Sequence, residues 1–114
     1  MYKIAICDSN KDDRESLYQL VQGYDPNASI TILKKPDSLL KEIQRKDCIY
    51  DIVFIEVHFG TKDGIEIADY INHVNANTQI IFNTRDSQAI CRAYSTRHAF
   101  YLLKDQWNLY LTDA

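Results

Sequence analysis

The sequence predicts an α/β protein with a doubly wound, five-stranded parallel sheet. Short runs rich in β-branched and aromatic residues alternate along the chain with segments in which apolar residues recur every three or four positions. The runs 51–55 and 78–83 contain the continuously apolar stretches IVFI and IIF, as in strands that helices cover on both faces. Helical crossovers between consecutive strands favour parallel pairing. Because the chain has 114 residues, an ordinary size for one domain, we expect it to form a single domain, 1–114.

Five runs are candidate strands because each is short and rich in Ile, Val, Phe or Tyr. They are 2–7 (YKIAIC), 29–33 (SITIL), 51–55 (DIVFI), 78–83 (TQIIFN) and 99–103 (AFYLL). Between them, four segments carry apolar residues at helical spacing: Leu17, Leu20, Val21 and Tyr24; Leu39, Leu40 and Ile43; Ile67, Ala68, Ile71 and Val74; Ala89, Ile90, Ala93 and Tyr94. A short fifth helix is expected over 105–114 (DQWNLYLTDA).

Capping residues support the helix starts. Asn10 or Ser9 can cap the first helix, Pro36–Asp37 open the second, and Asp63–Gly64 precede the third. The order of elements is therefore strand and helix in strict alternation.

Charge and apolar content exclude several classes of protein. The net charge of -3 gives no general attraction to nucleic acid or anionic membranes. No apolar run approaches the roughly 20 residues that span a bilayer, and the N-terminus has no leader-like pattern. We expect a cytoplasmic protein with no membrane partner and no direct nucleic-acid contact.

The three cysteines, Cys7, Cys48 and Cys91, are odd in number and widely spaced. This pattern favours reduced, packed thiols over a disulfide frame or a zinc site.

Polar residues gather where the predicted strands end. Asp8 and Ser9 follow the first strand, Glu56 ends the third, Thr84 follows the fourth and Lys104 follows the fifth. In doubly wound sheets, binding sites lie beyond the carboxyl ends of the strands. Each residue taken alone also fits a cap or an exposed strand end. Their joint placement predicts a shared site, where a lysine would offset the repulsion of two carboxylates and lower their pKa values.

The segments IAICDSNKDDRE, YDIVFIEVHFGTKDGIEIA, IIFNTRD and HAFYLLKD resemble the bacterial response-regulator receiver domain, especially receivers attached to LytTR-type DNA-binding domains. The resemblance extends from Met1 to about Lys104. It implies a flavodoxin-like, three-layer α/β/α fold with strand order 2-1-3-4-5. It also implies signalling in a two-component phosphorelay, through a histidine kinase or another signalling protein, and a role in transcription regulation.

In that family, two adjacent acids hold Mg²⁺ and an aspartate ending the third strand accepts a phosphoryl group. A hydroxyl after the fourth strand and a lysine after the fifth then engage the phosphate. By this resemblance, Asp8 matches the first acid, Thr84 the hydroxyl, Lys104 the lysine and Tyr101 the aromatic residue that changes rotamer on activation. Asp63–Gly64 match the pair that closes the loop after the acceptor.

Two positions depart from the family pattern. Ser9 replaces the second acid, which removes a charge that Mg²⁺ needs, so only weak metal binding at Asp8 is expected and no cofactor is required. Glu56 replaces the acceptor aspartate, and its extra methylene displaces the attacking oxygen by more than the roughly 1 Å that can cost 100-fold in rate. We predict a phosphorylation-independent pseudo-receiver without enzymatic activity, in which Glu56 fills part of the phosphate's place and pairs with Lys104.

Three alternatives remain open. A working receiver could use Asp8 or Ser9 as its acceptor, and a purely structural domain would not switch at all. The segment ICDSNKD also resembles the haloacid-dehalogenase phosphatases, which use a strand-end aspartate with Mg²⁺. Members of that family have a second aspartate at the position of Asn10, and their chains are longer. A small phosphohydrolase is therefore the weakest alternative.

The resemblance also implies an interaction surface on the fourth helix, fifth strand and fifth helix. Residues of that surface in this chain are Arg92, Tyr94, Arg97, Tyr101 and Trp107. The segment 105–114 is shorter than the family's last helix, so we expect either a receiver truncated from a longer regulator or an exposed apolar edge. A LytTR-type output domain or a second copy of the chain would cover that edge.

Overall fold

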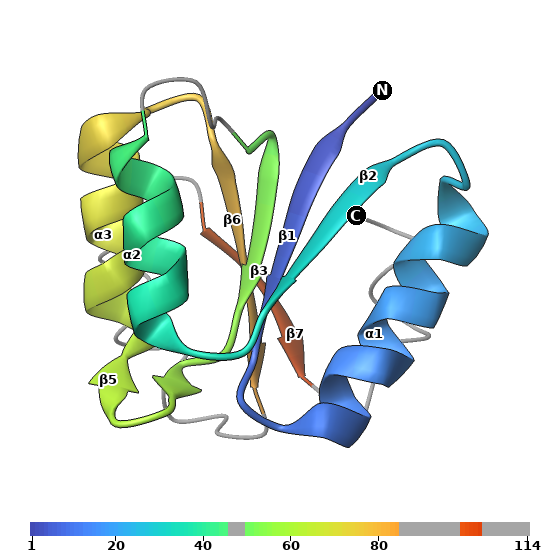
Figure 1. Cartoon of the computed structure of the whole chain (residues 1–114), viewed down its shortest axis with the longest axis horizontal. Coiled ribbons are helices and arrows are strands. Elements are labelled where there is room, and N and C mark those ends of the chain that lie inside the picture. Colours follow the sequence, from blue (N-terminus) through green and yellow to red (C-terminus); the bar gives the residue numbers. More distant parts are fainter. Residues whose placement is uncertain (46–49, 85–98, 104–114) are drawn as a thin grey trace.

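A five-stranded parallel sheet forms the centre of the molecule (Figure 1). The computed structural model describes residues 1–45 and 50–84, and the backbone of 99–103. The sheet contains β1 (Lys3–Cys7), β2 (Ser29–Leu33), β3 (Ile52–Ile55), β6 (Gln79–Thr84) and β7 (Ala99–Leu103). Their order is β2-β1-β3-β6-β7, with every pair parallel. The predicted order 2-1-3-4-5 of the five main strands is therefore confirmed.

Helices cover both faces of the sheet. Helix α1 (Lys11–Tyr24) lies on one face, and α2 (Pro36–Gln44) and α3 (Gly64–Val74) lie on the other (Figure 1). This arrangement gives the predicted three layers. The fourth and fifth predicted helices fall outside the described residues. In the described part of the chain, no helix is long and apolar enough to cross a membrane.

The predicted caps set the helix starts. Asn10, rather than Ser9, caps α1, because its Oδ1 accepts the Asp13 N–H at 3.0 Å. Asp63 caps α3 by accepting the Ile65 N–H at 2.9 Å. Helix α2 begins at Pro36, whose fixed φ suits the first helical position.

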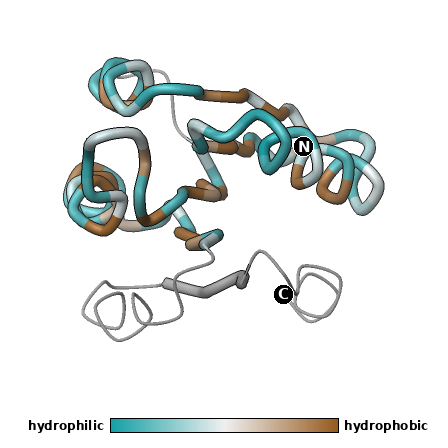
Figure 2. Tube along the Cα trace, turned by 90° about the horizontal axis from the view of Figure 1, so that it is seen from below, coloured by the Kyte–Doolittle hydropathy of each residue, from teal (hydrophilic) through white to brown (hydrophobic). Residues whose placement is uncertain are grey.

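Each face of the sheet buries its own hydrophobic cluster. The cluster facing α1 combines residues of that helix with β1, β3 and β6, namely Ile4, Ile6, Leu17, Val21, Phe54 and Ile81. The larger cluster, facing α2 and α3, includes the fully buried Leu39, Val53, Phe59 and Ile71. Figure 2 shows hydrophobic segments concentrated in the strands between the helices on the two sides. Burial of both sheet faces explains why β3 reads as a continuous apolar run.

A small hairpin follows β3 and was not predicted. Strands β4 (His58–Phe59) and β5 (Lys62–Asp63) pair antiparallel, where the sequence indicated only a loop (Figure 1). Gly60 turns the hairpin with a φ of 62°, a conformation that glycine adopts without strain. Phe59 is fully buried in the core beneath it. This burial fixes the hairpin beside the carboxyl ends of the strands.

Candidate functional site

Three polar side chains form a row at the carboxyl edge of the sheet. The register aligns Cys7 with Ile55 and Ile55 with Phe82, so the next residues, Asp8, Glu56 and Asn83, are neighbours on adjacent strands. Two positions earlier in these strands stand residues of the cluster facing α1: Ile6, Phe54 and Ile81. Because side chains alternate between faces, the polar row continues that apolar face. All three polar residues are buried, with Asn83 fully inaccessible.

One protein N–H reaches each carboxylate oxygen of Asp8. Its Oδ1 accepts the Asn10 N–H at 3.0 Å, and its Oδ2 accepts from Asn83 Nδ2 at 3.3 Å. The side chain is only 1% exposed, so these bonds replace contacts with water. The sequence predicted Asp8 at this edge but did not indicate what would hold it.

Arg14 is a second residue that the sequence analysis missed. One Nη of its guanidinium donates to the Asp8 carbonyl oxygen at 3.0 Å, and the residue is buried at the start of α1. Its position one helical turn after the Asn10 cap brings the cation back over the loop between β1 and α1. The charge therefore lies beside the backbone of Asp8.

Glu56 occupies the central strand of the row. Its backbone N–H donates to the Cys7 carbonyl at 3.0 Å, which continues the pairing of β1 and β3 beyond Ile55. Gly64 lies directly against the Glu56 carbonyl oxygen, and a Cβ at that position would overlap it. The Gly64 N–H also donates to the Val57 carbonyl at 2.7 Å. The expected Asp63–Gly64 pair therefore closes the loop by close backbone approach.

Thr84 and Ser9 lie near this row in different environments. The sequence predicted that Thr84 would follow the strand, whereas in the structure it is the last residue of β6. It is buried, and strand alternation places it on the face opposite Asn83. Ser9 is exposed in the turn before α1. The structure thus brings Asp8 and Glu56 together with a neutral amide that was not foreseen.

The remaining predicted residues lie wholly or partly outside the described part of the chain. Tyr101 lies in β7, where its backbone is paired with Phe82, but its side chain is outside the described part. Four interface candidates and the site lysine also fall outside the described residues: Arg92, Tyr94, Arg97, Trp107 and Lys104. The proposed pairing of Glu56 with Lys104 therefore stays a prediction.

Cys7 lies directly before Asp8 and is fully buried with a free thiol. Burial raises the pKa of this thiol, and the negative charge of Asp8 raises it further. The reactive thiolate is therefore suppressed at neutral pH. The prediction of a reduced, packed thiol is confirmed for Cys7, whereas Cys48 and Cys91 lie outside the described residues.

The residues at this edge do not fit the Mg²⁺ site that the resemblance implies. Mg²⁺ requires near-octahedral oxygen coordination with carboxylate ligands. Asp8 uses both oxygens to accept N–H groups, and the neighbouring Ser9 is neutral and exposed. Within residues 1–45 and 50–84, no three His, Cys, Asp or Glu side chains are grouped as a metal site would require.

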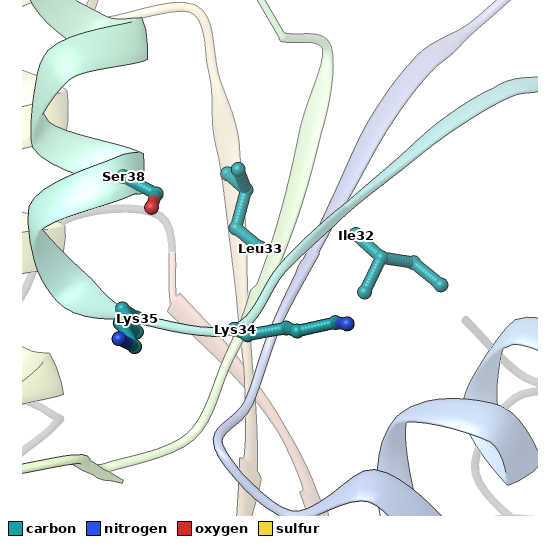
Figure 3. A pocket seen from close by; sticks show the side chains of 5 residues that line it. All are labelled: Ile32, Leu33, Lys34, Lys35 and Ser38. Carbon is teal, nitrogen blue, oxygen red and sulfur yellow. The ribbon is translucent and has the colours of Figure 1, made fainter.

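A separate open hollow of about 370 Å³ lies at the carboxyl end of β2. It is lined by Ile32, Leu33, Lys34, Lys35 and Ser38 (Figure 3). The two lysine side chains extend in different directions, and both are exposed. This arrangement does not converge on a ligand, so the row of Asp8, Glu56 and Asn83 is the better candidate site.

Comparison with known proteins identifies the family of this chain. The family model described as the response regulator receiver domain matches residues 4–112. The sensory transduction protein LytT of Enterococcus faecalis is 24% identical over 102 residues, which cover 89% of this chain. The chain spans 41% of the length of that curated relative.

Solved structures show the same fold. A two-component response regulator from Clostridium difficile has a TM-score of 0.79 and 24% identity, covering 99% of this chain and 91% of the other. The response regulator DrrB of Thermotoga maritima has a TM-score of 0.82 and 18% identity, covering 99% of this chain and 50% of the other. With the family model matching nearly the whole sequence, the chain belongs to the response regulator receiver domain family.

Proposed function

We propose that this receiver domain signals without accepting a phosphoryl group. The observation that carries the proposal is the position of Glu56 directly after β3, between Asp8 and Asn83 in the row. This is the position at which the family resemblance places the acceptor aspartate. The domain would then act as an interaction module rather than as an enzyme.

The geometry of phosphoryl transfer favours this proposal. A carboxylate that attacks phosphorus must lie in line with the leaving group, and small displacements lower the rate strongly. The extra methylene of Glu56 moves its oxygens along the path of attack. Close contact between Gly64 and the Glu56 carbonyl leaves the backbone little freedom to retreat and compensate. The result would be a carboxylate located where a phosphoryl group would otherwise lie.

Partners follow from family membership. Receiver domains of response regulators interact with histidine kinases, and a phosphorylation-independent receiver would bind a kinase or another signalling protein without receiving phosphate. We place its output in a LytTR-type DNA-binding domain, on the resemblance of the motifs. The predicted surface of Arg92, Tyr94, Arg97 and Trp107 would meet that domain or a second copy of the chain. A cytoplasmic location is part of the same proposal.

The decisive experiment is incubation with acetyl phosphate and Mg²⁺ followed by intact mass measurement. We expect no adduct on the wild-type chain, because Glu56 replaces the acceptor. A receiver that accepted phosphate would gain one phosphoryl group, on the order of 80 Da. A stoichiometric adduct mapped to Glu56 would overturn the proposal, and an adduct on Asp8 or Ser9 would establish the alternative receiver.

A variant pair sharpens this experiment. The double change Ser9→Asp with Glu56→Asp restores both acids and should allow a phosphoryl adduct to form. The matched control combines Ser9→Asp with Glu66→Asp, which shortens an exposed glutamate in the first turn of α3. This control should gain no adduct. Equal labelling of both double variants would show that position 56 does not decide phosphorylation.

A further inference from the structure

We propose that Asn83 takes the place of a divalent cation at the carboxyl edge of the sheet. Its amide would hold the Asp8 carboxylate and keep metal ions out, so that the domain maintains its acid pair without a cofactor. This inference rests on the proposed phosphorylation-independent function and gives that function a structural cause. Asn83 would act as a positioning residue for Asp8.

The first argument is the reach of the hydrogen bond. Asp8 follows β1 and Asn83 lies in β6, and β3 stands between these two strands. Two strand spacings amount to about 9.5 Å, so both side chains must extend toward each other across the end of β3. The Nδ2 atom of Asn83 lies 3.3 Å from Oδ2 of Asp8. The bridge therefore passes over the strand end from which Glu56 leaves.

The second argument is electrostatic. An amide N–H presents the positive end of its dipole, which suits a buried carboxylate but repels a cation approaching the same oxygen. The other Asp8 oxygen already accepts the Asn10 N–H, and Arg14 lies at the Asp8 carbonyl. Donors fixed by the fold thus stabilise the negative charge that a metal would otherwise neutralise. Only the N–H orientation of the Asn83 amide is compatible with an ionised Asp8.

The third argument is a comparison with a second buried asparagine. Asn72 in α3 is 5% exposed, and its Nδ2 donates to the Thr78 carbonyl at 2.9 Å. Among the described residues, neither Asn72 Oδ1 nor Asn83 Oδ1 has a hydrogen-bond partner. Both residues therefore use only their N–H groups. They differ in the acceptor, which is a neutral backbone carbonyl for Asn72 and a carboxylate for Asn83.

Isothermal titration calorimetry of the full chain with Mg²⁺ alone tests this proposal. Asn83→Ala removes the competing donor, and we expect it to bind Mg²⁺ at least tenfold more tightly than the wild type. Asn83→Asp keeps the size of the side chain and adds a third carboxylate to the row, so its affinity should be higher still. Asn72→Ala and Asn72→Asp are the matched controls, and their Mg²⁺ affinity should equal that of the wild type.

Three results would overturn the proposal. The first is wild-type binding of Mg²⁺ as tight as that of Asn83→Ala, and the second is no gain for Asn83→Asp. The second result remains decisive where Asn83→Ala fails to fold. The third is a gain that persists when Asp8→Asn is added to either variant, since the ion would then bind elsewhere. The proposed function has a separate readout, the phosphoryl adduct on the wild-type chain, so the two proposals can fail independently.

Discussion

The two ends of the sheet each bury an asparagine, but these residues serve different neighbours. At the amino end, Asn72 donates to the Thr78 carbonyl, and the Thr78 hydroxyl donates to the Tyr50 carbonyl at 2.7 Å. At the carboxyl end, Asn83 donates to the carboxylate of Asp8. The first network satisfies backbone groups where β3 and β6 begin. The second engages a charged side chain, which backbone pairing does not require.

We expect the two networks to contribute differently to stability and to ion binding. Buried backbone carbonyls need hydrogen-bond donors, so a network like that at the amino end is expected in any such sheet. A buried carboxylate costs far more than a carbonyl unless donors surround it, and the chain supplies such donors to Asp8 at the carboxyl edge of the sheet. Changes at the amino end should therefore alter the free energy of unfolding alone. Changes in the polar row should also alter ion binding.

The largest expected effect is the loss of stability when a core side chain near the carboxyl end of the sheet is removed. Phe59→Ala removes a fully buried ring under the hairpin, and it should lower the free energy of unfolding by about 3–5 kcal/mol. Urea denaturation measures this change. Tyr24→Ala, at a side chain that is 60% exposed on α1, is the control and should shift stability by about 0.5 kcal/mol or less. Equal effects of the two changes would show that the hairpin does not depend on the core.

The fold was largely predictable because its signals are local. Apolar runs predicted the five strands, and Asn10, Pro36 and Asp63 predicted the helix starts. The hairpin β4–β5 could not be predicted, because each of its strands has only two residues and its position depends on burial of Phe59. Two-residue strands carry no alternation that a sequence could show.

The candidate site was predictable only in part. Asp8 and Glu56 could be placed from the strand ends, since parallel strands bring those ends to one edge. Asn83 was missed because its partner Asp8 lies 75 positions away in sequence, and the contact exists only through the register of β1, β3 and β6. The signal present was an amide in an otherwise apolar run, two positions after Ile81. Arg14 was missed because it reads as an ordinary helix surface residue.

A pair of glycines tests how tightly the backbone is packed at the carboxyl end. Gly64→Ala would push a methyl group into the Glu56 carbonyl, and it should destabilise the domain by about 1–3 kcal/mol. Gly23→Ala, in α1 with no atom within 4 Å of the new methyl group, should stabilise the domain by about 0.5–1 kcal/mol. Thermal unfolding of both variants measures the contrast. Tolerance of Gly64→Ala would mean that the loop after Glu56 can shift, which would weaken the argument from fixed geometry.

A change at the amino end should affect stability without affecting ion binding. Thr78→Val removes the hydroxyl that donates to the Tyr50 carbonyl, and it should cost about 1 kcal/mol in urea unfolding. Its Mg²⁺ affinity should match that of the wild type, because the residue lies at the opposite end from Asp8. Thr61→Val, at an exposed position of the hairpin, is the matched control and should have little effect. Altered Mg²⁺ binding in Thr78→Val would show that the two ends are coupled.

The smallest effect up to pH 9 comes from Cys7, whose buried thiol lies next to the negative charge of Asp8. Because burial and Asp8 raise the pKa of Cys7 in the folded state above the ordinary value of 9.0, the unfolded chain loses this proton first as pH rises. The thiol therefore contributes stability fully below pH 9 and progressively less above it, a loss of about 0.4 kcal/mol at pH 9 itself. Urea unfolding across pH 8 to 10 should show this decline in the wild type and not in Cys7→Ala. The difference between the two slopes of unfolding free energy against pH then reports the single proton of the Cys7 thiol. Asp8→Asn should leave the decline between pH 8 and 10 nearly unchanged, since burial is the larger cause and still holds the pKa of the folded thiol well above this range. Parallel slopes for wild type and Cys7→Ala would mean that the Cys7 thiol is not held in its protonated form by the fold.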